Sequence, residues 1–286
     1  MANALYGKIQ TFYDEASALW EQTWGEHMHH GYYGADGRQR KNRRQAQIDL
    51  IDECLTWAGV TEAQAILDCG CGIGGSALEL ANRYQAKVVG ITLSPVQAQR
   101  ATERAQAANL GGTEPPSASF QVADALETPF ADQSFDLVWS MESGEHMPDK
   151  VAFLQECYRV LKPGGKLLMA TWCHRPTDSL AGPLTWLEQQ QLNWIYQVYG
   201  LPYVVALPDY EAIARNCGFS HQTSADWSLA VAPFWDEVIA SALSPESLAG
   251  LVKAGPGTLQ GALALGPMRQ GLHSGLIRYG LLCAVR

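Results

Sequence analysis

The chain has 286 residues, of which 47% are apolar and 17% charged, and its 29 Asp and Glu against 20 Lys and Arg give a net charge of −9. The apolar share is enough to bury a core, which excludes a wholly disordered protein, and the length fits one large domain or two small ones. The acidic balance argues against nucleic acid as a partner, because a nucleic-acid binder needs a cationic surface.

The chain has no run of about 20 apolar residues that would span a bilayer. Its start, MANALYGKIQTFYDEAS, lacks the apolar core of a signal peptide and the Arg- and Ser-rich composition of a transit peptide. We therefore expect a cytoplasmic location. The seven cysteines are an odd number in a long chain, so we expect reduced thiols rather than a disulfide framework or metal ligands.

The elements in chain order predict an α/β fold. Amphipathic patterns predict helices over 3–24 and 43–58, with a loop over 25–37 between them. Further strands are predicted over 65–68, 87–93, 117–123, 135–141, 164–173 and 276–285, and further helices over 76–84, from Ser94-Pro95, and over 150–161, 183–199 and 209–217. The alternation of strand and helix predicts a doubly wound, mostly parallel, Rossmann-like sheet with both faces covered.

A glycine-rich loop, DCGCGIGG, connects the first of these strands to the following helix. Glycine lets the backbone turn tightly and approach a ligand where a Cβ would clash. The spacing G-x-G-x-G differs from the G-x-G-x-x-G of dinucleotide sites, and the preceding acid would repel a pyrophosphate. An acid here suits a cationic ligand that bears an amine, such as S-adenosylmethionine. The candidate cofactor-binding residues in this loop are Asp68, Gly70, Cys71, Gly72, Gly74 and Gly75.

Polar residues also follow the next predicted strands. Thr92 stands where many nucleoside binders place an acid for the ribose hydroxyls, and its hydroxyl with Gln97 can make the same hydrogen bonds. A capping box with Ser94 is the alternative role of Gln97. Asp124 can accept a hydrogen bond from an adenine amino group, or can instead cap a turn. The remaining candidate cofactor residues are Leu93, Ala125, Ser140 and Met141.

The loop after the fourth of these strands, ESGEHM, is expected to face the ligand crevice, because the switch point of such a sheet lies beside strands one and four. Glu142 and His146 are four residues apart, so on a helical turn they share one face and can act together. Such a pair can take a proton from a phenol or an amine, which makes both residues catalytic candidates.

A second histidine cluster, GEHMHHGYY over 25–33, lies in the first predicted loop. The order H-x-H-H invites a metal interpretation, but no Cys or acid at zinc spacing accompanies it. We therefore expect no metal. We favour a lid or substrate wall for this segment, with plain packing as the alternative.

These segments together resemble the gamma-tocopherol C-methyltransferase family of class I S-adenosylmethionine-dependent methyltransferases. The matching segments cover nearly the whole chain and are FYDEASALWEQTWGEHMHHGYY, ILDCGCGIGGS, GITLSPVQ, FDLVWSMESGEHMPDK, VLKPGGKLLMATWCHRP, LPDYEAIA and ADWSLAVAPFW. The resemblance implies S-adenosyl-L-methionine as cofactor and methyl transfer to the free ring carbon ortho to a chromanol hydroxyl. Gamma-tocopherol would become alpha-tocopherol, and delta-tocopherol would become beta-tocopherol.

Two related activities stay open: an N-methyltransferase acting on an indole-alkaloid amine, and a methyl-phytylbenzoquinol methyltransferase. An oxidoreductase on the same core is disfavoured by Asp68 and by Thr92 in place of an acid. A non-catalytic lipid carrier would leave the glycine loop unexplained.

For a phenolic acceptor, a base near pH 7 is needed, and histidine is the side chain whose ordinary pKa lies there. We predict His146 as this base, with Glu142 orienting it or itself taking the proton, and with His29 and His30 as rivals. The candidate substrate-binding residues are Trp24, His29, His30, Tyr33, Trp172, His174 and Tyr203.

We expect one methyltransferase domain over 1–286. Residues 1–45 would form N-terminal lid helices, 60–175 the cofactor-binding core, and 176–286 the substrate-side helices and last strands. Segment 174–210 would join the first 45 residues as an inserted lid over the carboxyl edge of the sheet. A small lipophilic phenol as substrate also suggests peripheral membrane contact through 246–270, with burial of a C-terminal helix as the alternative.

Overall fold

The computed structural model describes residues 7, 10, 14, 21, 25–242 and 256–286. The helix expected over 3–24 and the substrate candidate Trp24 therefore lie almost entirely outside the described residues. The same is true of much of the segment 246–270.

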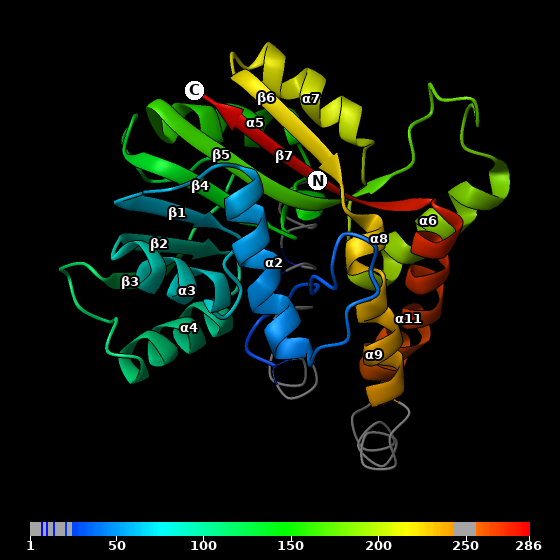
Figure 1. Cartoon of the computed structure of the whole chain (residues 1–286), viewed down its shortest axis with the longest axis horizontal. Coiled ribbons are helices and arrows are strands. Elements are labelled where there is room, and N and C mark those ends of the chain that lie inside the picture. Colours follow the sequence, from blue (N-terminus) through cyan, green and yellow to red (C-terminus); the bar gives the residue numbers. More distant parts are fainter. Residues whose placement is uncertain (1–6, 8–9, 11–13, 15–20, 22–24, 243–255) are drawn as a thin grey trace.

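A seven-stranded sheet forms the centre of the described part of the chain, in the order β3-β2-β1-β4-β5-β7-β6 (Figure 1). The strands are β1 (Ala65–Cys69), β2 (Lys87–Thr92), β3 (Ser117–Val122), β4 (Phe135–Met141), β5 (Leu161–His174), β6 (Ser220–Asp226) and β7 (Ile277–Val285). The first five strands pair in parallel, and β7 runs antiparallel to both β5 and β6. The predicted Rossmann-like, mostly parallel sheet is confirmed.

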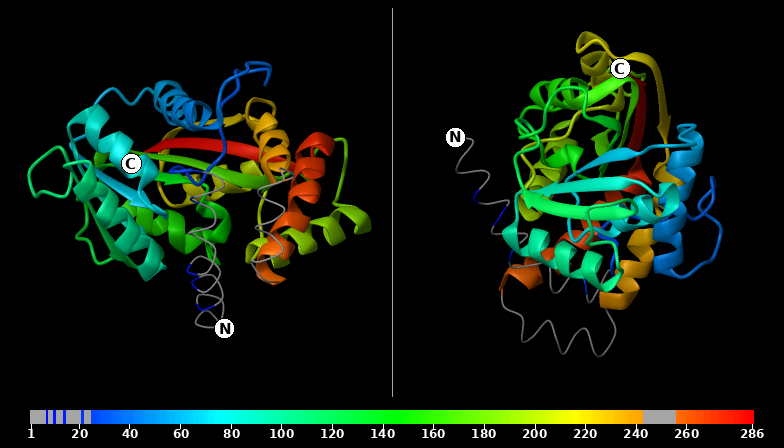
Figure 2. Two further views of the ribbon diagram at one scale, coloured as in Figure 1. Left: turned by 90° about the horizontal axis from the view of Figure 1, so that it is seen from below. Right: turned by 90° about the vertical axis from the view of Figure 1, so that its left-hand side faces the viewer.

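Helices cover both faces of this sheet (Figure 2). They are α2 (Arg43–Trp57), α3 (Gly75–Tyr84), α4 (Pro95–Ala107), the 3₁₀ turn η1 (Gly144–His146), α5 (Lys150–Val160), α6 (Trp186–Tyr199), α7 (Leu207–Asn216), α8 (Ser228–Val231), α9 (Pro233–Ala242) and α11 (Pro256–Ser274). Alternate strand residues enter separate cores. Ile66 packs in a cluster with residues of α2 and α3, whereas Leu67 packs with residues of α5 and α7.

Several helix starts follow from local capping. The side chain of Asn42 accepts from the backbone N–H of Gln45 at the start of α2, and Ser94 caps α4 before Pro95. At α6 the structure differs from the expected start at 183. Thr185 and Glu188 form a capping box, which makes Trp186 the first helical residue.

Strand β6 was missed by the sequence analysis. Its sequence, SHQTSAD, is polar and mostly exposed, because it forms the edge of the sheet beside β7. An edge strand with little buried surface does not show the apolar alternation by which strands are recognised. The sheet therefore ends in two antiparallel strands, β7 and β6, where the sequence predicted only the strand over 276–285.

The segment after β5 leads into a group of helices at the carboxyl side of the sheet. Figure 1 shows α6, α11 and α9 side by side there, and α11 packs against both of its neighbours. Of these three helices, only α6 belongs to segment 174–210, for which the inserted lid was predicted.

Candidate functional site

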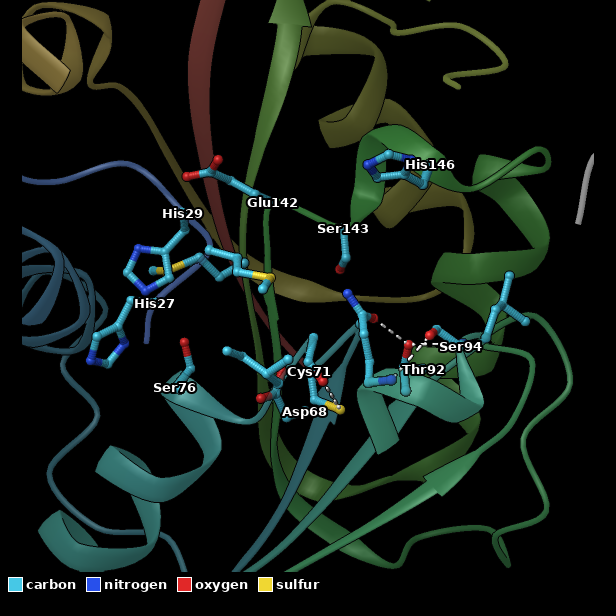
Figure 3. Close-up of a pocket in the computed structure, with 18 of the residues that line it drawn as sticks. His27, His29, Asp68, Cys71, Ser76, Thr92, Ser94, Glu142, Ser143 and His146 are labelled. Atoms are coloured by element: carbon cyan, nitrogen blue, oxygen red, sulfur yellow. Dashed lines mark hydrogen bonds between the residues drawn. The ribbon is translucent and has the colours of Figure 1, made fainter. Parts of the chain in front are cut away.

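A pocket lies where the carboxyl ends of β1, β2 and β4 meet the glycine loop (Figure 3). Asp68 at this edge is paired with Gly90 of β2 and with Trp139 of β4, so the pocket lies at the point where the strand order reverses. The predicted residues that line it are Asp68, Gly70, Cys71, Gly72, Gly75, Thr92, Leu93, Gln97, Met141, Glu142, His146 and His29. The structure therefore brings together residues from six predicted segments.

Gly70 and Gly72 of the loop differ in the space that a side chain would find. Both have a positive φ, of 81° at Gly70 and 52° at Gly72. A Cβ on Gly70 would lie 2.3 Å from the Cβ of Ser143, so packing against the loop after β4 forbids it. A Cβ on Gly72 would meet no heavy atom within 4 Å. Gly72 thus leaves open space on the pocket wall, where a ligand can approach the backbone.

The carboxylate of Asp68 is the unusual group of this wall. Its side chain is 2% exposed, and its Oδ2 is buried without a hydrogen-bond partner. Burial raises the pKa of Asp68 to about 7. A buried carboxyl oxygen left without a donor indicates that a cationic or hydrogen-bonding ligand completes the site.

Thr92 and Gln97 form a second polar feature of the pocket. The hydroxyl of Thr92 donates to Oε1 of Gln97 at 2.8 Å, and the backbone N–H of Gln97 donates to the hydroxyl of Ser94 at 3.0 Å. Ser94 therefore caps the helix as expected, while the side-chain oxygen of Gln97 accepts from Thr92. Both polar groups remain on the pocket wall.

A smaller adjoining pocket contains Asp124 and Ala125, together with Gly70, Leu93 and His146. One oxygen of Asp124 accepts from the backbone N–H of Leu126 at 2.9 Å. The turn-capping role is thus present, and the residue still borders the pocket. Gly74 and Ser140 are not among the residues lining either pocket. Gly74 packs under Phe120, and the Ser140 hydroxyl lies 2.7 Å from that of Ser143.

The loop after β4 differs from the expected helical turn. The 3₁₀ turn η1 begins only at Gly144, and Glu142 has a left-handed backbone with φ 52°. Figure 3 shows the side chains of Glu142 and His146 pointing apart. The carboxylate of Glu142 accepts from the backbone N–H and the ring of His30, at 2.7 and 2.8 Å, and from the Tyr279 hydroxyl at 3.0 Å. Glu142 thus joins the first loop and β7.

His146 is half-buried and borders both pockets. Burial, together with the nearby ammonium of Lys150, lowers its pKa to about 3. That ammonium donates to the carbonyl oxygens of Gly144, Glu145 and Met147 at 2.7 to 2.9 Å. Lys150 therefore fixes the loop that carries His146.

The first loop is fixed from the opposite side by Gln47. This residue of α2 is fully buried and donates its amide to the carbonyl oxygens of His27 and His29, at 2.5 and 2.9 Å. Neither Lys150 nor Gln47 was predicted from the sequence as a residue of the site. A signal for Gln47 existed, because it lies three and four residues before Leu50 and Ile51 on the apolar stripe of its helix.

The ring of His30 is packed in a buried aromatic cluster. Its ring centroid lies 6.0 Å from that of Trp172, 4.7 Å from Phe234 and 5.3 Å from Tyr279, and Tyr199 lies 5.3 Å from Trp172. The contacts of Trp172 with His30 and with Tyr199 are edge-to-face, and the other two are tilted. Such ring contacts are typical of aromatic cores and of apolar binding sites. The cluster adjoins the pocket through Glu142.

The other substrate candidates lie outside both pockets. The Tyr33 hydroxyl donates to Glu237 at 2.9 Å in the core, and His174 donates from Nδ1 to the carbonyl of Arg175 at 2.7 Å. Tyr203 is 38% exposed and packs against the Lys150 ammonium.

Among the described residues, no group of three or more His, Cys, Asp and Glu is placed to hold a metal ion. No helix within the same residues is both long and apolar enough to cross a membrane.

Comparison with known proteins identifies the family. Residues 67–169 match the model of a methyltransferase domain. The chain is 44% identical to the chloroplastic tocopherol O-methyltransferase of Arabidopsis thaliana, covering 98% of this chain and 82% of that protein. It is 34% identical to the 2-methyl-6-phytyl-1,4-hydroquinone methyltransferase of Synechocystis, covering 97% of this chain and 87% of that protein.

The fold has close relatives among solved structures. The cyclopropane synthase MmaA2 from Mycobacterium tuberculosis superposes with a TM-score of 0.83 at 20% identity, covering 98% of each chain. This likeness supports the fold, while the curated relatives support the family. The chain is therefore a methyltransferase with S-adenosyl-L-methionine as its cofactor, and it belongs to the tocopherol methyltransferase family of class I S-adenosylmethionine-dependent methyltransferases.

Proposed function

We propose that the protein transfers a methyl group from S-adenosyl-L-methionine to a ring carbon of a prenylated phenol, converting gamma-tocopherol to alpha-tocopherol and delta-tocopherol to beta-tocopherol. The observation that carries this proposal is the 44% identity, over 98% of the chain, to a relative named for tocopherol. The relative named for the phytyl hydroquinone is 34% identical, which makes that quinol the second candidate acceptor.

The cofactor would lie in the pocket at the glycine loop. Asp68 would accept from the cofactor's cationic amine, which would satisfy its buried oxygen. Thr92 and Gln97 would bind the ribose hydroxyls, and Asp124 with Ala125 would border the adenine in the adjoining pocket. When bound there, the cofactor supplies an electrophilic methyl group on its sulfonium.

The chain's own contribution would be orientation, exclusion of water and proton removal. The loop over 25–33 lies against the pocket and is held by Gln47 and Glu142. The aromatic cluster behind Glu142 would favour an apolar acceptor. The roles of His146 and Glu142 in removing the phenolic proton stay a prediction from the sequence.

A lipophilic acceptor also requires a route from lipid, so peripheral membrane contact remains part of the proposal. Segment 246–270 falls mainly on residues whose side chains lie outside the described part of the structure. Large exposed apolar side chains do gather around the start and outer face of α6, at Leu180, Trp186, Leu187 and Trp194.

The test is an acceptor panel with isotopically labelled cofactor: gamma- and delta-tocopherol, the methyl-phytyl hydroquinone, and an indole amine. We expect the tocopherols to be methylated with the highest kcat/KM. The product from gamma-tocopherol should co-elute with alpha-tocopherol and keep a free phenol. A methyl ether as product would contradict ring methylation, and a preference for the quinol or the amine would contradict the proposed acceptor.

A further inference from the structure

His29 lines the pocket, and its ring carries a buried nitrogen without a hydrogen-bond partner. Its Nδ1 lies 2.7 Å from the carbonyl oxygen of His30. A carbonyl oxygen can only accept, so Nδ1 carries the ring hydrogen and Nε2 carries the lone pair. The residue is 6% exposed, and Nε2 has no hydrogen-bond partner. A residue of the pocket wall therefore carries an oriented acceptor to which no described group donates.

The position of this ring is fixed on two sides. Gln47 holds the carbonyl oxygens of His27 and His29 from α2, and Glu142 holds the backbone N–H and ring of His30 from the end of β4. A group that takes a proton during a reaction must be held within hydrogen-bond reach of it, so this double anchoring is what a base requires.

The surroundings of His29 also suit a neutral base. Burial lowers its pKa, which keeps the ring uncharged and its Nε2 available, while the nearby carboxylate of Glu142 acts in the opposite direction. Glu142 would therefore stabilise the imidazolium that forms when a proton arrives. Glu142 also raises the pKa of His146, but the ammonium of Lys150 lies beside that ring and opposes a second positive charge. Figure 3 shows His29 and Glu142 on the same side of the pocket.

We propose that Nε2 of His29 accepts the phenolic proton of the acceptor, an inference that rests on the proposed function and replaces His146 as the base. The O–H electron pair stays on the phenol oxygen and enriches the ortho ring carbon. That carbon forms a bond to the methyl group while the methyl–sulfur bond of the cofactor breaks and leaves its electron pair on sulfur. The methylated carbon then releases its hydrogen to water as a proton, and Nε2–H returns its proton to the oxygen. One proton is released for each methyl group transferred.

The test compares His29→Asn, His29→Gln and His146→Asn with a control, His221→Asn, on the exposed edge strand β6. The amide nitrogen of Asn can replace Nδ1–H toward the His30 carbonyl, so His29→Asn keeps the anchoring contact and removes only Nε2. We expect kcat with gamma-tocopherol to fall by about 10²-fold or more in His29→Asn. The Kd for S-adenosylhomocysteine, measured by calorimetry, should stay at the wild-type value.

A second acceptor separates proton removal from a structural effect. A prenylated phenol with an electron-withdrawing ring substituent is already ionised near pH 8, so it should lose much less activity in His29→Asn than gamma-tocopherol does. Equal losses with both phenols, or wild-type turnover in His29→Asn and His29→Gln, would overturn the inference. A wild-type enzyme that methylates none of these phenols would instead overturn the proposed function, and the inference with it.

Discussion

The carboxylate of Glu142 accepts two hydrogen bonds from His30, a residue 112 positions earlier in the chain, at 2.7 Å from the backbone N–H and 2.8 Å from the ring. It accepts a third from the Tyr279 hydroxyl. Burial acts to raise the pKa of Glu142. The contacts with His30 stabilise the charged carboxylate more strongly, so the pKa is lowered overall. Glu142 thus connects the histidine loop, the end of β4 and strand β7 beside the pocket.

We predict that Glu142→Gln destabilises the protein and reduces turnover. The amide has one acceptor oxygen, so at least one donor of His30 or Tyr279 loses its partner, at a cost of about 1–3 kcal/mol. The matched control is Glu237→Gln, which alters a single contact with the Tyr33 hydroxyl. Thermal melts and kcat should fall more in Glu142→Gln than in the control, and equal effects would contradict the connecting role.

Much of this site could be predicted from the sequence because its signals are local. The glycine loop, the strand before it and the cap at Ser94 lie within short segments with strong preferences. The contact between Glu142 and His30 could not be predicted, because the two residues are 112 positions apart and a local sequence pattern carries no information about such a distant contact. The expected helical face for Glu142 and His146 was replaced by a left-handed residue and a short 3₁₀ turn.

We predict that Asp68→Asn stabilises the cofactor-free protein and weakens cofactor binding. Its pKa rises from 3.8 to about 7 in the folded protein, so the cofactor-free protein loses stability as the pH rises through this window. Asp68→Asn removes that penalty, on the order of 2–4 kcal/mol. The cofactor-free variant should therefore melt at a higher temperature than the wild type at pH 8, and at a similar temperature at pH 4.

The same variant should bind S-adenosyl-L-methionine much more weakly, because it cannot offer a negative charge to the cofactor. Melting curves at the two pH values and calorimetry measure both effects. Wild-type affinity in Asp68→Asn would remove Asp68 from the cofactor site.

Gly72→Ala tests whether the open face of the glycine loop belongs to the cofactor. The control is Gly164→Ala, because Gly164 also has a positive φ, of 79°, and open space around it, but lies near the start of β5, away from the glycine loop. Both variants carry the same backbone strain, about 1–2 kcal/mol. We expect only Gly72→Ala to lose cofactor affinity, and similar dissociation constants in the two variants would show that the loop face is not occupied.

Lys150 is predicted to set the affinity of the pocket through the loop after β4. In Lys150→Met the carbonyl oxygens of Gly144, Glu145 and Met147 lose their common donor, at a cost of about 1–3 kcal/mol. The control Lys162→Met removes a half-exposed pair with Asp136, worth about 0–1 kcal/mol. The melting temperature and the KM for the cofactor should change in Lys150→Met alone. An unchanged KM would mean that the loop holds its position without this ammonium.

The outer side of α6 is predicted to contact lipid. Trp186 and Leu187 are 69% and 71% exposed, and Trp194 is 38% exposed, whereas Leu192 and Ile195 of the same helix are buried in the core. Glu188 is the one charged residue of α6, and it is paired with Arg175. A face with two tryptophans and no free charge suits the interface of a bilayer and does not depend on anionic lipid.

Vesicle flotation with uncharged phosphatidylcholine measures this contact. We expect the wild type to float with the vesicles at low and high salt, and Trp186→Ser with Trp194→Ser to reduce the bound fraction. Activity on gamma-tocopherol in vesicles should fall, while activity on the same acceptor in detergent micelles should be kept, because the pocket is unaltered. Leu229→Ser, at a 72% exposed position on α8, is the control. Equal flotation of the double variant and the wild type would rule out α6 as the lipid-facing element.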